Sequence, residues 1–223
     1  MIVVCYGIHK SASTFTYQIV KEILLANFDS VECPDGVFPA KENSLAQFKD
    51  IILSDNKVLV IKTHGASTPY VDELKSQTRV LSTANYRDPR EIALSMIDHG
   101  NRSREQGQEN VMAGIETIDD AISLLKVEIK RFETWTAHDF NMPVFYEDIC
   151  FDSIPNVKKL FTHLTGKPST DEDAQAILDK FSERKNIMFN KGKKKRYEED
   201  MTQENSQKIV DAFPEFYSKY INN

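Results

Sequence analysis

Three short segments combine cationic, hydroxyl and imidazole side chains at the points where apolar runs end. Residues 10–14 follow the first run, residues 62–64 follow a second, and Arg87 follows a third. Lysine and arginine neutralise bound anions, main-chain N–H groups at a strand-to-helix turn hold phosphate groups, and histidine accepts protons near neutral pH. These residue types predict a site for a phosphate-bearing ligand that also contains a general base.

The first of these segments reads KSAST and separates a predicted buried strand from a helix whose apolar positions begin at Phe15. Such a loop can cradle a phosphate with its backbone. It does not match the nucleotide loop G-x-x-x-x-G-K-[ST], because Gly7 is followed by no second glycine. A kinase or an ATP-hydrolysing enzyme is therefore less favoured. A role in capping the helix alone stays an alternative.

The other two segments allow both a functional and a structural interpretation. His64 stands beside Lys62 and could serve as a general base, although a lone histidine is more often structural. Arg87 is followed eight residues later by Ser95, and its guanidinium could grip a phosphate with two hydrogen bonds. The alternative for Arg87 is a surface ion pair with Asp88 or Glu91.

Strand-like and helix-like segments alternate along the chain, which predicts an α/β fold. It is a single domain over residues 1–223, with a mostly parallel central sheet and helices on both faces. In such folds ligands bind at the carboxyl ends of the strands. The polar stretch 100–114 is expected to be an exposed loop. Strands are expected at 1–6, 58–61, 79–85 and 144–146, and helices from residue 15, from 89, and over 115–135, 154–164, 171–181 and 204–217.

Composition excludes several classes of protein. The chain carries 28 Lys plus Arg and 34 Asp plus Glu, a net charge of −6, which makes general nucleic-acid binding unexpected. No apolar run reaches the roughly 18 residues that span a bilayer, and no signal peptide is visible. The three cysteines are widely spaced, so we expect reduced thiols and a cytoplasmic protein. Five cations nevertheless gather within residues 191–196, which predicts a local anion site or a solvated loop.

The first loop resembles the 5′-phosphosulfate loop of the cytosolic-type sulfotransferases, and the resemblance runs over most of the chain. These enzymes transfer a sulfuryl group from 3′-phosphoadenosine-5′-phosphosulfate (PAPS) to a hydroxyl or amine and release 3′,5′-adenosine bisphosphate (PAP). Their P-loop-like motif K-[ST]-[AG]-[ST]-T-[WF] is matched by Lys10, Ser11, Ala12, Ser13, Thr14 and Phe15.

Three further motifs of that family follow in the same order. The K-[TS]-H that ends the catalytic strand is matched at 62–64, and the 3′-phosphate motif is matched by Arg87 through Ser95. A Tyr-Glu-Asp that supplies an adenine contact begins at Tyr146. Each motif alone is weak or moderate, but four in order at strand ends make the resemblance specific.

The family's last motif, R-K-G-x-x-G-x-W-K followed by Thr, is altered here. Asn190, Lys191 and Gly192 open it, Tyr197 replaces the Trp, and Thr202 keeps its place. Loss of the arginine removes a bidentate cation, which Lys193, Lys194 or Arg196 could replace only in part. We therefore expect a looser or rearranged contact with the 3′-phosphate.

The resemblance implies roles for these residues. Lys10, Lys62 and His64 would be catalytic, with His64 as the base, and Phe15 and Tyr146 would flank adenine. No metal is expected, because no group of ligand-type residues has suitable spacing. The acceptor would be a small molecule, lipid or carbohydrate, bound by residues of the segments 29–43, 66–72 and 100–114. A compact, bacterial-like enzyme, monomeric or weakly dimeric, is expected; a small-molecule kinase or a catalytically silent nucleotide-binding protein remains the alternative.

Overall fold

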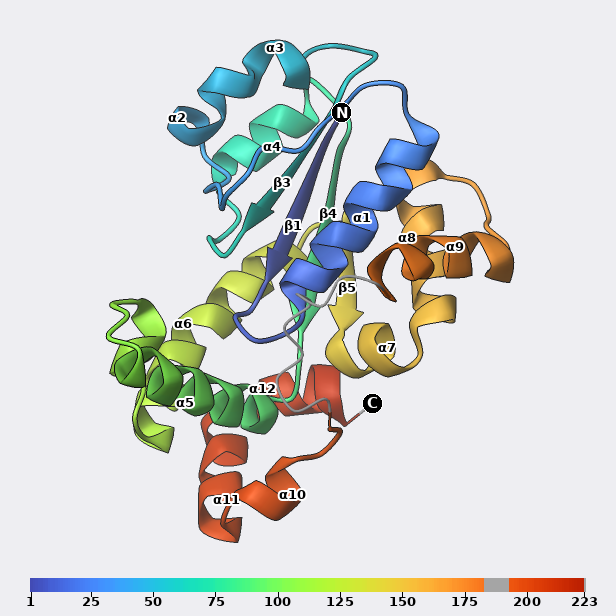
Figure 1. The fold of residues 1–223 in the computed structure, drawn as a ribbon. Helices are drawn as coiled ribbons and strands as arrows, with labels where there is room; N and C mark the ends of the chain where they lie inside the picture. The colour runs from blue at the N-terminus through green and yellow to red at the C-terminus, as the bar shows by residue number, and fades with distance from the viewer. Residues whose placement is uncertain (183–192, 223) are drawn as a thin grey trace.

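Five parallel strands form one sheet in the order β2-β3-β1-β4-β5 (Figure 1). The computed structural model describes residues 1–182 and 193–222. Val4 at the centre of the sheet lies opposite Ile61 and Ser82, so the central strands end at the same edge. The predicted mostly parallel sheet is confirmed. The strands are β1 Ile2–Gly7, β2 Val31–Glu32, β3 Val58–Thr63, β4 Val80–Tyr86 and β5 Asn141–Phe145.

Helices cover both faces of this sheet, as the alternating pattern predicts (Figure 1). Side chains alternate along β1: Ile2, Val4 and Tyr6 pack into one core cluster, whereas Val3 and Cys5 pack into the other. The second cluster is covered by α1 (Ser13–Asn27), α8 (Ser153–Thr165) and α9 (Asp171–Ser182). The first is covered by α4 (Pro69–Lys75), α5 (Pro89–Glu105), α6 (Ile118–Thr136) and α11 (Gln203–Ala212).

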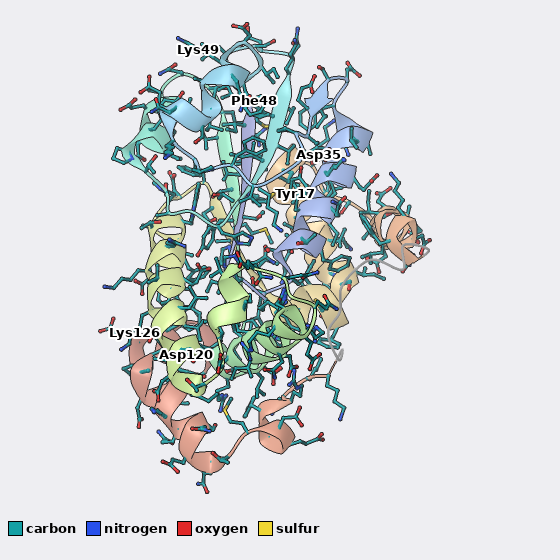
Figure 2. All side chains as sticks on the ribbon, turned by 60° about the vertical axis from the view of Figure 1, so that its left-hand side comes forward. Tyr17, Asp35, Phe48, Lys49, Asp120 and Lys126 are labelled. Carbon is teal, nitrogen blue, oxygen red and sulfur yellow. The ribbon has the colours of Figure 1, made fainter. Side chains whose placement is uncertain are left out.

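The long helix α6 is amphipathic, as its apolar spacing predicts. It begins with a capping box in which Thr117 and Asp120 bond each other's backbone N–H. Lys126 lies on its exposed face, as Figure 2 shows, while Leu125, Glu128 and Ile129 are buried. A glutamate therefore faces the protein interior from a helix that otherwise buries apolar residues.

The predicted exposed loop at 100–114 is wrong in its first part. Helix α5 continues to Glu105, and the 3₁₀ helix η2 (Val111–Gly114) packs against it. Gly100 makes this packing possible, because a Cβ there would lie 2.5 Å from the carbonyl oxygens of both Met112 and Ile115. The helix thus continues through a polar stretch, and its contact with η2 is a tertiary contact that the sequence pattern does not show.

Other boundaries also differ from the sequence prediction. Tyr146 opens α7 (Tyr146–Phe151), so it follows β5 and is not its last residue. The predicted helix 204–217 ends at Ala212, because Phe213 leaves the helical conformation before Pro214. The remaining elements are short: α2 Glu42–Leu45, η1 Ala46–Phe48, α3 Lys49–Ile52, α10 Tyr197–Asp200, α12 Pro214–Phe216 and η3 Tyr217–Ile221. None of the described helices is long and apolar enough to cross a membrane.

Candidate active site

The loop between β1 and α1 is held in a tight turn by backbone and hydroxyl contacts. Lys10 and Ala12 adopt left-handed conformations, with φ of 67° and 62°. The Ser11 hydroxyl donates to the Ile8 carbonyl oxygen at 2.6 Å and also lies 3.3 Å from the Asn85 carbonyl oxygen of β4. A Cβ at Gly7 would lie 2.3 Å from the Ser13 Cβ, so only glycine permits this approach.

The first turn of α1 has no side-chain cap among the described residues. Ala12 is the N-cap residue, and its side chain has no acceptor for a cap hydrogen bond. The alternative that residues 10–14 serve only as a helix cap is therefore not supported. N–H groups that no described side chain caps, at the start of a 15-residue helix with its dipole, favour an anion.

Two lysines lie on either side of this helix start. The Lys62 ammonium donates to the Thr14 hydroxyl at 2.7 Å, and the Lys10 ammonium lies 2.9 Å from His99 Nδ1. Burial lowers the pKa of both lysines, and for Lys10 the charges of Arg102 and Arg87 lower it further. Neither ammonium forms an ion pair with a carboxylate in the described part of the chain. Neighbouring cations that no described carboxylate pairs with favour a bound polyanion.

His64 lies at the end of β3 with one ring nitrogen fixed. Its Nδ1 is 2.6 Å from the Gly7 carbonyl oxygen, and since a carbonyl only accepts, Nδ1 carries the proton and Nε2 has the free lone pair. Burial, and then the charge of His9, lower the pKa of His64 to about 4. The imidazole is therefore neutral near pH 7 and can accept a proton at Nε2.

A second histidine and a buried carboxylate adjoin His64. The His9 ring stacks on the His64 ring with centroids 3.9 Å apart. His9 Nδ1 lies 3.0 Å from Glu128 Oε2, and Glu128 Oε1 is 3.0 Å from the Arg131 guanidinium. The sequence prediction missed these residues. A detectable signal was present, because Glu128 occupies a core-facing position between Leu125 and Phe132.

His9, His64 and Glu128 are also the one group within the described ranges whose possible metal-ligand atoms all lie within 4.8 Å of one another. Nδ1 of each histidine is already engaged, by Glu128 or by the Gly7 carbonyl. The remaining lone pairs lie in ring planes only 19° apart, whereas a shared ion needs lone pairs that converge. We assign no metal to this group, and a metal-free reaction stays a prediction.

Arg87 follows β4 and is buried among aromatic and acidic groups. Its guanidinium carbon lies 3.7 Å from the centre of the Tyr146 ring, and its Nη2 is 2.7 Å from Glu91 Oε2. The ion pair left open by the sequence thus forms, but it is buried and not on the surface. Arg87 Nε is buried without a hydrogen-bond partner among the described residues, which leaves a donor for a ligand. Ser95 lies one helical turn beyond Glu91 on α5 and is also buried.

The two predicted adenine contacts lie in different surroundings. Tyr146 packs beneath the Arg87 guanidinium, and burial raises the pKa of its hydroxyl to about 12 against the pull of Arg87. Phe15 lies in the core, edge-on to Phe181 of α9 with centroids 5.9 Å apart. The structure thus brings Tyr146 to the arginine, while the adenine contact of both residues remains a prediction.

Only the end of the altered basic motif can be placed, because Asn190, Lys191 and Gly192 lie outside the described residues. Arg196 is buried and bonds Asp98 at 2.9 Å and Asp200 at 2.6 Å. The Tyr197 N–H donates to Glu91 Oε1 at 2.9 Å, so this segment contacts the carboxylate that also holds Arg87. The lysines are engaged too: Lys193 with Glu199, Lys194 with the Phe151 ring and Lys195 with Glu198.

Comparison with known proteins connects this arrangement to solved structures alone. No protein-family model matches the chain, and no curated protein matches it in sequence. The mouse sulfotransferase SULT7A1 complexed with PAP superposes with a TM-score of 0.67 and 14% identity, over 100% of this chain and 86% of that one.

A second solved protein shares the same fold. Retinol dehydratase with androsterone and the inactive cofactor PAP has a TM-score of 0.63 and 16% identity, covering 100% of this chain and 83% of that one. Its complex with retinol and PAP has a TM-score of 0.62 and 15% identity, covering 98% and 81%. The chain has the sulfotransferase fold, as the sequence motifs predict.

Proposed function

We propose that this protein is a sulfotransferase that moves the sulfuryl group of PAPS to a hydroxyl or amine acceptor. One observation carries the proposal. The ends of three neighbouring parallel strands bring the KSAST loop, the Lys62–His64 segment and Arg87 to a single sheet edge. The fold is shared with a sulfotransferase and a retinol dehydratase that were both solved with PAP, which supports the same use of that edge.

The nucleotide would bind across this site, from the loop that precedes α1 to Arg87 after β4. The 5′-phosphosulfate would lie on the backbone of residues 11–14 at the start of α1. The 3′-phosphate would accept from Arg87, whose Nε has no partner in the described structure, and from Ser95. Tyr146 and Phe15 would contact adenine, and Asn190, Lys191 and Gly192 would close on the 3′-phosphate.

The chemical step would be an in-line displacement at sulfur. The acceptor oxygen or nitrogen bonds to sulfur, the bond from sulfur to the bridging oxygen breaks, and its electron pair stays on the 5′-phosphate of PAP. His64 Nε2 takes the acceptor's proton, because its Nδ1 is committed to the Gly7 carbonyl. Lys10 stabilises the leaving phosphate, and Lys62 holds the sulfuryl oxygens. Positioning and charge stabilisation supply the rate enhancement, as in phosphoryl transfer.

The acceptor would enter beside His64. The solved relative with androsterone and PAP shows that the fold accommodates a small apolar molecule together with the nucleotide. In this chain the segments 29–43 and 66–72 remain candidates for the acceptor pocket. Of the segment 100–114, only residues 106–110, between α5 and η2, form a loop. A small molecule, lipid or carbohydrate that bears a hydroxyl or amine is the proposed class.

A thermal-shift titration with PAP, run beside AMP, ADP and ATP with Mg²⁺, tests the nucleotide site. A ligand at about 100 times its dissociation constant adds roughly 2.7 kcal/mol of stability, or several degrees in Tm for a chain of this size. PAP alone should give this shift. A shift with only ATP and Mg²⁺ would favour a kinase and contradict the proposal.

The reaction itself is tested by chromatographic detection of PAP released from PAPS in the presence of phenols, aliphatic alcohols, sugars and amines. Acceptor-dependent release of PAP is the expected result. Binding of PAP without turnover on any acceptor would instead identify a catalytically silent nucleotide-binding protein.

A further inference from the structure

The His64 ring is fixed by two contacts of different kinds. The hydrogen bond from Nδ1 to the Gly7 carbonyl oxygen holds one atom, at 2.6 Å, but leaves the ring able to turn about that bond. The stack with His9, at 3.9 Å between centroids and 19° between planes, removes this freedom. The two contacts together set the direction of the Nε2 lone pair.

His9 can fulfil this role because it is itself clamped. Its backbone N–H and its Nδ1 both bond Glu128 Oε2, at 3.2 Å and 3.0 Å. The Glu128 side chain is fully buried, and Arg131 engages its other oxygen. Tyr6 donates from its hydroxyl to the Glu128 carbonyl oxygen at 2.9 Å, which ties this turn of α6 to β1.

Glu128 is ionised in this environment. Burial alone would raise its pKa, but the hydrogen bonds and charge of His9, with the charge of Arg131, bring the pKa below its usual value. A buried carboxylate on Nδ1 fixes the tautomer of an imidazole and stabilises its charged form, as carboxylates do in catalytic triads. His9 is thus a polar ring held in a fixed orientation by an ion pair on α6.

We propose that His9, clamped by Glu128 and stacked on His64, is a positioning residue that fixes the His64 ring and places an ionisable group against its face. The inference rests on the proposed function of His64 as the base. His9 need not touch the acceptor or PAPS, since it acts through the His64 ring.

The electrostatic effect of His9 on the pKa of His64 can be measured. His9 is the second-largest cause, after burial, of the lowered pKa of His64. Removal of His9 should therefore raise the pKa of His64 from about 4. Because the base works only when unprotonated, turnover should then fall at a higher pH than in the wild type. The charged and titratable groups around the two rings are Lys10 of the loop, Lys62 of β3, His99 of α5, and Glu128 and Arg131 of α6.

Two substitutions at one position separate orientation from charge. His9→Ala removes both the ring and its electrostatic effect on His64, whereas His9→Phe keeps a ring for stacking and removes that electrostatic effect. In His9→Ala we expect kcat at pH 8 to fall about tenfold through loss of orientation. On the acidic side of its pH profile (the acid limb), the fall in kcat should occur at a pH roughly one unit higher than in the wild type. In His9→Phe most of the loss at pH 8 should be recovered, while the acid limb stays shifted.

The measurements are kcat for PAPS turnover and the NMR titration of the His64 ring in the same variants, both over a pH range that begins below the wild-type pKa of about 4 and extends past pH 8. A His9→Ala protein with wild-type kcat at pH 8, or with His64 titrating at the wild-type pH, would overturn the inference. If the wild type transfers no sulfuryl group to any acceptor, the proposed function fails by itself. The His64 titration still decides whether His9 acts on that ring.

Discussion

The two ends of the candidate site differ in how their cations are compensated. At the end formed by β1 and β3, Lys10 and Lys62 contact an imidazole and a hydroxyl. At the end formed by β4 and α5, Arg87 is bound by the buried Glu91, and Arg196 by the half-buried Asp98 and the exposed Asp200. The first end is ready to receive an anion, whereas the second already holds acidic partners of its own.

This difference predicts how much each end of the site would contribute to the binding of the nucleotide. Two partly buried ammonium groups with no carboxylate partner in residues 1–182 or 193–222 are destabilising until a polyanion binds, so they favour tight binding of the phosphosulfate. An arginine that is already paired gains less from a phosphate, because the phosphate competes with Glu91. The 5′ end should therefore dominate binding and chemistry, and the 3′ end should mainly discriminate between nucleotides.

The largest effect is expected for the base at the first end. His64→Ala should lower kcat about 10² to 10⁴-fold, because it removes the proposed general base. PAP binding should survive, since the substitution removes no phosphate contact. PAPS turnover and a PAP thermal shift on the same protein check both statements. Full sulfuryl transfer by His64→Ala would assign the base to another residue.

The next effect concerns the selectivity of the second end. Arg87→Ala should weaken PAP binding roughly 10- to 100-fold, the value of one or two charge-assisted hydrogen bonds. Arg87→Lys should recover part of the loss as a point charge. Calorimetric titration with PAP and with AMP, which lacks the 3′-phosphate, separates the contributions. An equal loss for both nucleotides would mean that Arg87 supports the fold and not the 3′-phosphate.

The contrast between the ends also explains which features could be predicted from the sequence. The strand ends and the KSAST and Lys62–His64 segments follow from short local patterns, and the parallel sheet brings them together. The pairing of His9 with Glu128 joins residues 119 positions apart, and only the packing of α6 on β1 creates it. The helical course of 100–105 was missed for a similar reason, because the contact of Gly100 with η2 is tertiary.

A smaller effect tests whether Arg196 replaces the arginine missing from the basic motif. Because Arg196 is held by Asp98 and Asp200, Arg196→Gln should reduce stability by about 1 to 3 kcal/mol, or several degrees in Tm. PAP affinity should change by no more than about twofold. Lys193→Gln, at an exposed pair, is the matched control and should change stability by less than about 0.5 kcal/mol. A large loss of PAP affinity with unchanged Tm would place Arg196 on the nucleotide.

The last prediction concerns a pH dependence of stability at the second end. Burial raises the pKa of Glu147 to about 7 against the charge of Arg87, and its Oε2 has no hydrogen-bond partner among the described residues. The folded state therefore holds a proton that the unfolded chain releases near its ordinary pKa of about 4.3. The contribution of Glu147 to the free energy of unfolding is therefore complete below that pH. It is lost as the pH rises through 7.

Glu147→Gln keeps the shape of the side chain and removes the titration. Urea midpoints at pH 5, 6, 7 and 8 should show the variant gaining stability over the wild type as the pH rises, with most of the gain complete by pH 8. Asp148→Asn, at the exposed neighbouring position, should show no such trend. A constant difference between Glu147→Gln and the wild type would mean that Glu147 is ionised throughout. The second end would then hold one more fixed negative charge facing Arg87, and the contrast with the lysine end would be larger.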